Sequence, residues 1–343
     1  MNKNHHLYQE DLSNILSIKG IEQLKGKRIL ITGATGLLGM CMIDALMMLG
    51  DVKIYAVGRD WKRASQRLGE YADNPMFEFI QQDVLQPLPP HLLVDYIIPA
   101  ASNTHPLAYS QYPVETMLIN IKGAEYALEL AVRCGATVLY PSTVEVYGNA
   151  IGQDVFTEDY TGKLNLANSR ACYTESKRSC EALCQSYISE KDAKVKIVRL
   201  SRIFGPSMLL SDSKASSQFI NKAVMGQDIV LKSKGEQYFS YTYMADAVSA
   251  MLYVMLHGVV GTAYNVSVED CNVHLKDFAS LCAAAAGKTV VFDLPDEVER
   301  KGFSIATQAI LDNSLIKSIG WSPRYTMKDA VQRTIDILKN ESH

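Results

Sequence analysis

The sequence predicts an α/β protein built on a doubly wound parallel sheet, with a small C-terminal mixed α/β cap. Short apolar runs alternate with helical segments over roughly the first 200 residues, at the spacing of β-α-β units. A glycine-rich turn joins the first apolar run to the first helical segment. After Gly205-Pro206 the regular alternation stops, which indicates that the remaining third folds over the strand ends, where open sheets bind ligands.

Six strands are expected in the main sheet because their residues form short runs of apolar and β-branched side chains. They are Arg28–Thr32, Lys53–Val57, Phe77–Ile80, Asp95–Pro99, Thr137–Tyr140 and Lys194–Leu200. Helices are expected between and after them at Leu37–Leu49, Pro113–Cys134, Cys172–Ser189, Phe219–Met225, Ala245–Leu256, Leu275–Ala286 and Met327–Leu338. We therefore predict a helical lead-in (1–25), a Rossmann-type domain (26–204) and a region that is mainly cap (205–338), from which strands can rejoin the sheet.

Composition excludes several classes of protein. The 343 residues carry 34 Lys and Arg against 37 Asp and Glu, and this near-neutral balance argues against nucleic-acid binding. No apolar run approaches the ~18 residues of a membrane span. Seven scattered cysteines favour reduced thiols, so we expect a cytoplasmic protein with no membrane partner. No cluster of residues has metal-ligand spacing, and we predict no metal site.

The glycine-rich turn has the context of a dinucleotide site. It reads Gly33-Ala-Thr-Gly36-Leu-Leu-Gly39, after a strand and before a helix. Glycines let the backbone turn tightly and approach a pyrophosphate, which then meets the N–H groups at the helix start. The predicted cofactor contacts here are Gly33, Thr35, Gly36, Leu37, Leu38 and Gly39.

The position that reads the adenosine ribose is Gly58-Arg59-Asp60, after the second strand. A guanidinium at Arg59 suits a 2′-phosphate, with Arg63 as a further charge, so NADP is favoured over NAD. Asp60 offers the alternative of holding the 2′-hydroxyl of NAD, and a solvated basic turn is the structural alternative.

Tyr173 and Lys177 lie four residues apart, on one face of a helix. An ammonium group so placed is expected to lower the pKa of the phenol, so that Tyr173 can act as a base. The same pattern recurs at Tyr187 and Lys191, so position decides between them, and only Tyr173 follows a loop that would overlie a substrate.

A polar segment leaves the carboxyl end of the fifth expected strand, Pro141-Ser-Thr-Val-Glu-Val-Tyr-Gly148. Thr143 offers a hydroxyl and Glu145 a carboxylate to a sugar. Capping of the strand end would explain the hydroxyls but not an acid in so apolar a stretch.

These motifs occur in order with Arg199-x-x-x-x-x-Gly205-Pro206, and over residues 26–338 the chain resembles the extended short-chain dehydrogenases/reductases. Within them it is most similar to UDP-glucuronate decarboxylases and related NAD-dependent nucleotide-sugar enzymes. The resemblance implies that Tyr173 takes the proton of the sugar 4-hydroxyl, Thr143 holds that oxygen, Lys177 binds the nicotinamide ribose and Glu145 is a second acid or base. It further implies cofactor contacts from Tyr173, Lys177, Asp83, Val84, Ala100, Ala101, Ser102 and Asn120, and substrate contacts from Asn103, Thr104, Glu145, Met208 and Arg300.

Three positions depart from the pattern. Val144 stands where 4,6-dehydratases carry an acid and decarboxylases a hydroxyl. Phe239 stands where an arginine usually holds the substrate pyrophosphate, and Arg202 replaces an asparagine. Arg202 and Phe239 are therefore candidate substrate contacts, with Arg202 able to replace the lost charge, to suit another acceptor or to form an ordinary ion pair.

We expect an NAD- or NADP-dependent nucleotide-sugar enzyme that oxidises C4 transiently. UDP-glucuronate decarboxylation is the favoured reaction, epimerisation the next and 4,6-dehydration the third. A cofactor-sensing module without turnover is the alternative from another class, although a sensor would not need Thr143, Tyr173 and Lys177 together. The helices Pro113–Cys134 and Cys172–Ser189 are the candidate surface of a homodimer, although core packing explains the same pattern.

Overall fold

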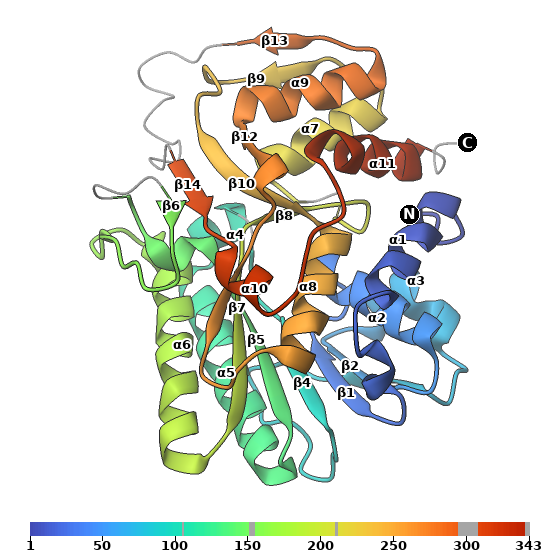
Figure 1. Ribbon diagram of the computed structural model, residues 1–343, viewed down its shortest axis with the longest axis vertical. Coiled ribbons are helices and arrows are strands. Elements are labelled where there is room, and N and C mark those ends of the chain that lie inside the picture. Colours follow the sequence, from blue (N-terminus) through green and yellow to red (C-terminus); the bar gives the residue numbers. More distant parts are fainter. Residues whose placement is uncertain (105, 151–154, 210–211, 294–307, 340–343) are drawn as a thin grey trace.

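The computed structural model describes residues 1–104, 106–150, 155–209, 212–293 and 308–339, and it confirms the predicted fold class (Figure 1). The large sheet has seven strands in the order β11-β7-β5-β4-β1-β2-β3, and all neighbours are parallel. They are β1 (Arg28–Thr32), β2 (Lys53–Gly58), β3 (Phe77–Gln81), β4 (Tyr96–Pro99), β5 (Thr137–Thr143), β7 (Lys194–Leu200) and β11 (Ala263–Val266). The strand order reverses between β1 and β4, which creates the crevice where such sheets bind ligands.

Helices cover both faces of this sheet. On one face α5 (Pro113–Cys134) packs against α6 (Ala171–Lys191), and on the other α2 (Leu37–Leu49) packs against α8 (Met244–His257) (Figure 1). The six predicted strands and the three predicted helices of this domain are all present, with ends that shift by up to three residues. Two short helices that the sequence did not indicate, α3 (Trp61–Leu68) and α4 (Pro106–Gln111), complete the domain.

The C-terminal third contains more strand than the sequence indicated. A second sheet pairs β12 (Asn272–His274), β10 (Tyr238–Tyr243), β14 (Gln308–Leu311) and β6 (Val155–Phe156), and β8 (Arg202–Phe204) also pairs with β10. A two-stranded sheet joins β9 (Ile229–Leu231) and β13 (Val290–Phe292). The helices of this part are α7 (Ala215–Val224), α9 (Leu275–Ala286), α10 (Ser314–Ser318) and α11 (Met327–Lys339). Most of these strands are only three or four residues long, too short for a periodic pattern to show.

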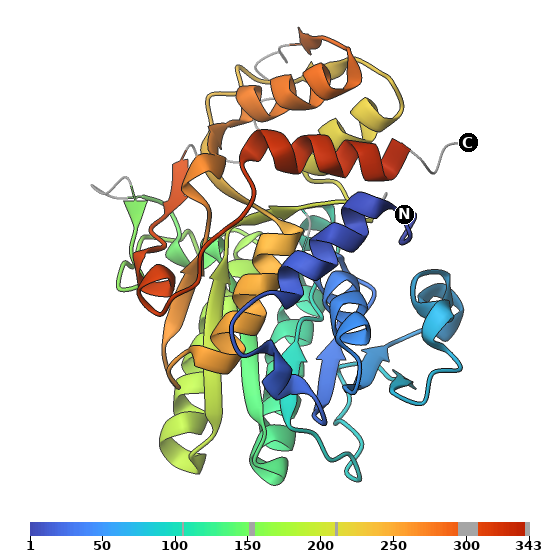
Figure 2. The same cartoon turned by 45° about the vertical axis from the view of Figure 1, so that its right-hand side comes forward.

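The N-terminal helix α1 (His6–Leu16) ties the two parts of the chain together. It packs against α2, α8 and α11, and the two terminal helices lie side by side (Figure 2). The fully buried carboxylate of Asp11 accepts hydrogen bonds from the Tyr243 hydroxyl at 2.5 Å and the Tyr325 hydroxyl at 2.8 Å. Arg333 of α11 completes this site with an ion pair at 2.8 Å. A buried charge so fully partnered fixes the cap against the sheet domain.

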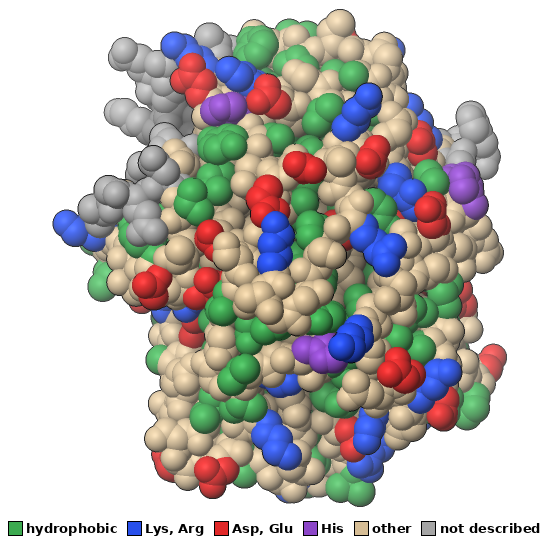
Figure 3. Space-filling model, viewed as in Figure 1, with side chains coloured by type: hydrophobic (Ala, Val, Ile, Leu, Met, Phe, Trp, Pro, Cys, Tyr) green, Lys and Arg blue, Asp and Glu red, His purple; other side chains and the backbone are tan. Residues whose placement is uncertain are grey.

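The surface charges and the cysteines do not point to a particular function. Basic and acidic side chains are interspersed on the face seen in Figure 3. None of the helices in the described ranges combines the length and the apolar character that crossing a bilayer requires. All seven cysteines carry free thiols. A cytoplasmic location stays a prediction.

Candidate active site

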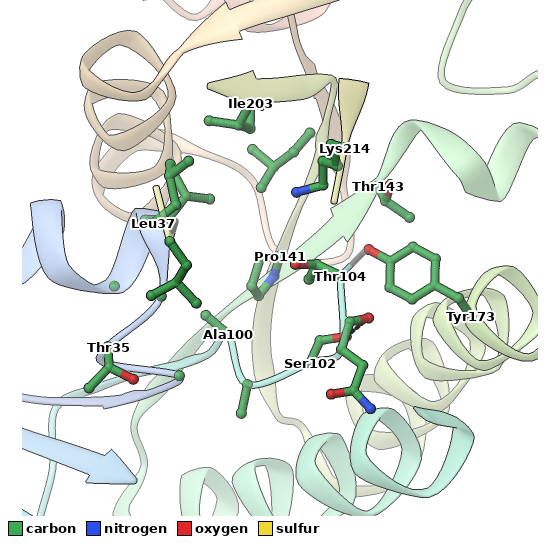
Figure 4. Close-up of a pocket in the computed structure, with 18 of the residues that line it drawn as sticks. Thr35, Leu37, Ala100, Ser102, Thr104, Pro141, Thr143, Tyr173, Ile203 and Lys214 are labelled. Atoms are coloured by element: carbon green, nitrogen blue, oxygen red, sulfur yellow. Dashed lines mark hydrogen bonds between the residues drawn. The ribbon is translucent and has the colours of Figure 1, made fainter. Parts of the chain in front are cut away.

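A cavity of about 740 Å³ opens at the carboxyl edge of β1, β4 and β5, between the sheet and the cap. The glycine turn and the end of β2 form one end of its wall, and β8, β10 and α7 of the cap contribute to the other. Tyr173 enters from α6 with its hydroxyl pointing to the middle, whereas Lys214 reaches in from the cap (Figure 4). The crevice that the strand order creates is thus roofed by the C-terminal third.

The glycine turn has the close contacts that a phosphate-binding turn needs. Gly33 has φ +68°, and a Cβ there would lie 2.7 Å from the carbonyl carbon and oxygen of Ala100. A Cβ on Gly39 would lie 2.4 Å from the Gly33 oxygen. Gly36 precedes α2 and provides no side-chain cap, so the first N–H groups of the helix remain available to an anion. The turn therefore fits the pyrophosphate of a dinucleotide.

The adenosine end of the cavity is basic. Arg59 and Arg63 line it together with Asp83 and Val84. Asp60 also lines this end, and its Oδ1 caps α3 by accepting the backbone N–H groups of Lys62 (2.8 Å) and Arg63 (3.4 Å). The acid that could hold a ribose hydroxyl thus serves as a helix cap.

Tyr173 is a buried phenol held from both sides. Its ring stacks on that of Tyr109 from α4, with 4.8 Å between the ring centroids. Burial is the main cause that raises its pKa, the charge of Glu145 raises it further, and a hydrogen bond with the Thr143 side chain lowers it. Sequence reasoning gave Tyr109 no role.

Lys177, one turn after Tyr173 on α6, is also buried. It is 4% exposed, and its Nζ donates to the Pro141 carbonyl at 2.8 Å and faces the Tyr140 ring. Burial lowers the pKa of Lys177 from 10.5 to about 8. Burial opposes the charged form of both groups, and the prediction that the ammonium lowers the pKa of the phenol stays a prediction.

The polar strand end is fixed by a network behind the cavity. Ser142 donates to Glu181 of α6, which forms an ion pair with Arg199 of β7 at 2.8 Å. In front, Glu145 lines the cavity and accepts a hydrogen bond from the Thr174 hydroxyl at 3.3 Å. Thr143 and Glu145 are therefore held at the same strand end as Tyr173 and Lys177.

Most of the predicted site residues meet in this one cavity. Its wall includes Gly33, Thr35, Gly36, Leu37, Leu38, Gly39, Arg59, Asp83, Val84, Ala100, Ala101, Ser102, Asn103, Thr104, Thr143, Glu145, Tyr173, Lys177, Arg202 and Phe239. Asn120 and Met208 are buried and do not line it, and the Asn120 amide donates instead to the Ser176 hydroxyl at 2.8 Å. Arg300 lies outside the described residues.

Two further arginines differ from the sequence interpretation. Arg202 forms no ion pair in the described part of the chain, and its guanidinium carbon lies 3.5 Å from the centroid of the Phe239 ring. Arg67, which the sequence did not single out, also lines the cavity and donates to the Ser207 carbonyl. The ordinary ion pair considered for Arg202 is therefore absent from the described residues.

This fold and this site define a dinucleotide-binding enzyme of the short-chain dehydrogenase/reductase type. Three features identify this type: a glycine turn packed on backbone, a helix start without a side-chain cap, and a buried Tyr–Lys pair at the same strand edges. The model of the NAD dependent epimerase/dehydratase family matches residues 29–267, and the chain belongs to this family.

Individual relatives agree with this assignment. The chain is 30% identical over 329 residues to UDP-glucuronic acid decarboxylase 1 of Xenopus tropicalis, covering 94% of this chain and 75% of that protein. A structure of UDP-glucuronic acid 4-epimerase from Bacillus cereus, in complex with UDP-glucuronic acid and NAD, has TM-score 0.77 and 20% identity, covering 92% and 99% of the two chains. A dTDP-glucose 4,6-dehydratase from Streptomyces venezuelae with NAD bound has TM-score 0.78 and 21% identity, covering 92% and 97%.

The lowered pKa of Lys177 gives a prediction about stability. A folded-state pKa of about 8, against 10.5, means that the folded protein binds the proton less tightly than the unfolded chain. The free energy of unfolding should therefore rise by about 3 kcal/mol as the pH rises from about 8 to 10.5, and this gain should be absent in Lys177→Met. Urea unfolding of both proteins across this range measures the difference.

Lys191→Met is the matched control, because Lys191 lies at the exposed end of the same helix and belongs to the second Tyr–Lys pattern. A difference between wild type and Lys177→Met that stays constant with pH would contradict the assignment.

Proposed function

We propose that the protein is a nucleotide-sugar enzyme that oxidises C4 of its substrate transiently, with decarboxylation of UDP-glucuronate as its reaction. The single observation that carries the proposal is the convergence of Thr143, Glu145, Tyr173 and Lys177 on one cavity with the glycine turn. The decarboxylase relatives, 30% identical over nearly the whole chain, support the choice of reaction.

The roles of the residues follow from their positions. The bound dinucleotide supplies a hydride acceptor that later returns the hydride. Tyr173 takes the proton of the 4-hydroxyl, and Thr143, whose hydroxyl interacts with the same phenol, orients the sugar oxygen. Oxidation at C4 places the C6 carboxylate β to a ketone, so carbon dioxide can leave. Glu145, half-buried beside Thr174, is placed to pass a proton from water to C5 after carbon dioxide has left. Lys177 binds the nicotinamide ribose.

Val144 narrows the choice of reaction. It is 5% exposed and lines the cavity between Thr143 and Glu145, where its aliphatic side chain cannot donate a proton. Dehydration needs an acid for the departing 6-hydroxyl, so this reaction is disfavoured. Epimerisation needs no proton donor at that position and is the second candidate. A sensor without turnover has no use for the four converging polar side chains.

Mass spectrometry of the product tests the proposal. Incubation with UDP-glucuronate should release carbon dioxide and give a UDP-pentose, whereas UDP-glucose should not be dehydrated. Tyr173→Phe should lower turnover by at least ~100-fold, because it removes the proton acceptor. A uronate product of unchanged mass but inverted stereochemistry would show that the reaction is epimerisation and not decarboxylation. Full activity in Tyr173→Phe would overturn the mechanism.

We also propose that the cofactor is NADP rather than NAD. Arg59 and Arg63 line the adenosine end, and Asp60 is engaged as the cap of α3. Arg59 forms only an exposed ion pair with Glu115 at 3.3 Å, and such a pair can be exchanged for a phosphate at little cost. A 2′-phosphate would then gain a charge-assisted contact that a hydroxyl cannot make.

The expected result is that wild type binds NADP more tightly than NAD and that Arg59→Gln weakens NADP by about tenfold while leaving NAD within about twofold. Isothermal titration of both cofactors measures this. Lys62→Gln is the matched control, because Lys62 is a neighbouring cation of α3 that does not line the cavity. Equal losses for the two cofactors would show that Arg59 does not read the 2′-phosphate.

A homodimer through α5 and α6 remains our proposal for the assembly. The exposed apolar side chains Val114, Leu118 and Val132 of α5 support it, because their spacing places them along one side of the helix. We expect a dimer by sedimentation velocity, and Val114→Glu with Leu118→Glu should shift it to monomer. A wild type that sediments as a monomer at micromolar concentration would exclude this interface.

A further inference from the structure

Arg199 lies at the centre of a row of cross-strand partners at the carboxyl end of the large sheet. In register, it stands opposite Ser142 of β5 on one side and Asn265 of β11 on the other. Residues that stand opposite each other in neighbouring strands point to the same face of a sheet. Helix α6 packs on β5 and β7 and brings Glu181 to this row. Arg199 therefore connects the strand that enters the active site to the two strands beside it.

The guanidinium of Arg199 is held in one orientation by its hydrogen-bond partners. Its Nε and Nη2 bind the two carboxylate oxygens of Glu181, with Nε to Oε1 at 3.1 Å and Nη2 to Oε2 at 2.8 Å. Its Nη1 donates to the Tyr147 hydroxyl at 2.9 Å and to the Glu158 carbonyl at 2.6 Å. A bidentate arginine–carboxylate pair fixes geometry as well as charge. Arg199 is thus placed to set the positions of the groups around it.

These contacts reach both ends of the short segment that carries two of the proposed catalytic groups. Before them, Ser142 donates to the same carboxylate of α6 that Arg199 binds. After them, the hydroxyl of the buried Tyr147 accepts from Arg199 directly. Thr143 and Glu145 lie between these two fixed residues. Arg199 therefore constrains the backbone from which both side chains enter the active-site cavity.

Arg199 itself does not line the active-site cavity. It borders a second cavity of about 470 Å³, which opens to solvent between α6, the β7–β11 pair and α10. The side chains of Arg199 and Glu181 are 15% and 13% exposed, so the pair can be reached from this second cavity. Any effect of Arg199 on the reaction therefore passes through the residues that it holds.

We propose that Arg199 is a positioning residue that sets the places of Thr143 and Glu145 without contacting the substrate. It acts through the Glu181 carboxylate at one end of the segment and through the Tyr147 hydroxyl at the other. This inference rests on the proposed function for the roles of the two positioned residues. Loss of Arg199 is expected to slow the chemical step more than it weakens binding.

Steady-state kinetics of Arg199→Ala with UDP-glucuronate test the assignment. The kcat should fall by about 10- to 100-fold, because a misplacement of about 1 Å at a catalytic site has an effect of this size. The KM and the dissociation constant of the cofactor should stay within about threefold. Arg199→Lys should stay as slow, because an ammonium cannot bind two carboxylate oxygens and a phenol in this geometry. Lys194→Ala is the control, since Lys194 is the exposed first residue of the same strand.

The second cavity allows the missing group to be supplied from solution. Guanidinium chloride at millimolar concentration, far below the molar range that unfolds proteins, should raise the kcat of Arg199→Ala by at least about fivefold. It should leave wild type and Lys194→Ala unchanged. Methylammonium chloride at the same concentration should give no rescue, because it carries the charge but not the planar fork of donors.

Two milder variants remove the contacts one at a time. Tyr147→Phe keeps the buried ring and loses only the hydroxyl, and Ser142→Ala loses the hydroxyl at the other end of the segment. Each should lower kcat by about three- to tenfold, less than Arg199→Ala does, and neither should respond to guanidinium. Because each change removes a single oxygen, these variants test the proposal even if Arg199→Ala does not fold.

The outcomes separate a positioning role from other roles. A folded Arg199→Ala with the kcat of wild type would overturn the proposal, and so would a loss confined to KM. A lost kcat with a lowered melting temperature and no rescue by guanidinium would assign Arg199 to stability alone and would overturn it too. A wild type that epimerises UDP-glucuronate would correct the proposed reaction, and the same comparison of kcat values on that product would then decide this inference. A wild type without activity on any nucleotide sugar would overturn the proposed function and this inference with it.

Discussion

The wall of the cavity buries positive charge that the protein chain does not neutralise. Lys177, Arg202 and Arg67 line it without a carboxylate in ion-pair distance among the described residues. Behind the cavity the chain does the opposite, since Arg199 is paired with Glu181 at 2.8 Å. Burial lowers the pKa of each of these three side chains. Unpaired buried charge costs stability, and the binding of an anionic ligand offsets that cost.

The position of these charges depends on how the cap is joined to the sheet. β8 begins two residues after β7 ends, so one nearly continuous stretch carries Arg202 from the sheet domain into the cap. β8 then pairs with β10, which places Arg202 beside Phe239. The buried Asp11 separately joins α1 to α11. The cap is therefore joined to the sheet domain at two places, through β8 and through the Asp11–Arg333 ion pair.

The sequence predicted what local patterns determine and missed what packing determines. The strand Arg28–Thr32, the glycine turn after it and the Tyr173–Lys177 pair are each encoded within a few residues. The short cap strands and the stacking of Tyr109 on Tyr173 arise between segments far apart in the chain, where no periodic signal exists. The burial that raises the pKa of Tyr173 and lowers that of Lys177 could not be predicted, because spacing along a helix gives proximity but not burial.

Charge in the wall of the cavity also affects proton transfer at Tyr173. Burial raises the pKa of this phenol, and the negative charge of Glu145 acts in the same direction. A diphosphate bound nearby without a cation would also raise the pKa of Tyr173. A guanidinium that pairs with the diphosphate cancels most of that field at a distance. A cation in the wall of the cavity therefore affects both the binding of an anionic substrate and the pKa of the group that takes the proton.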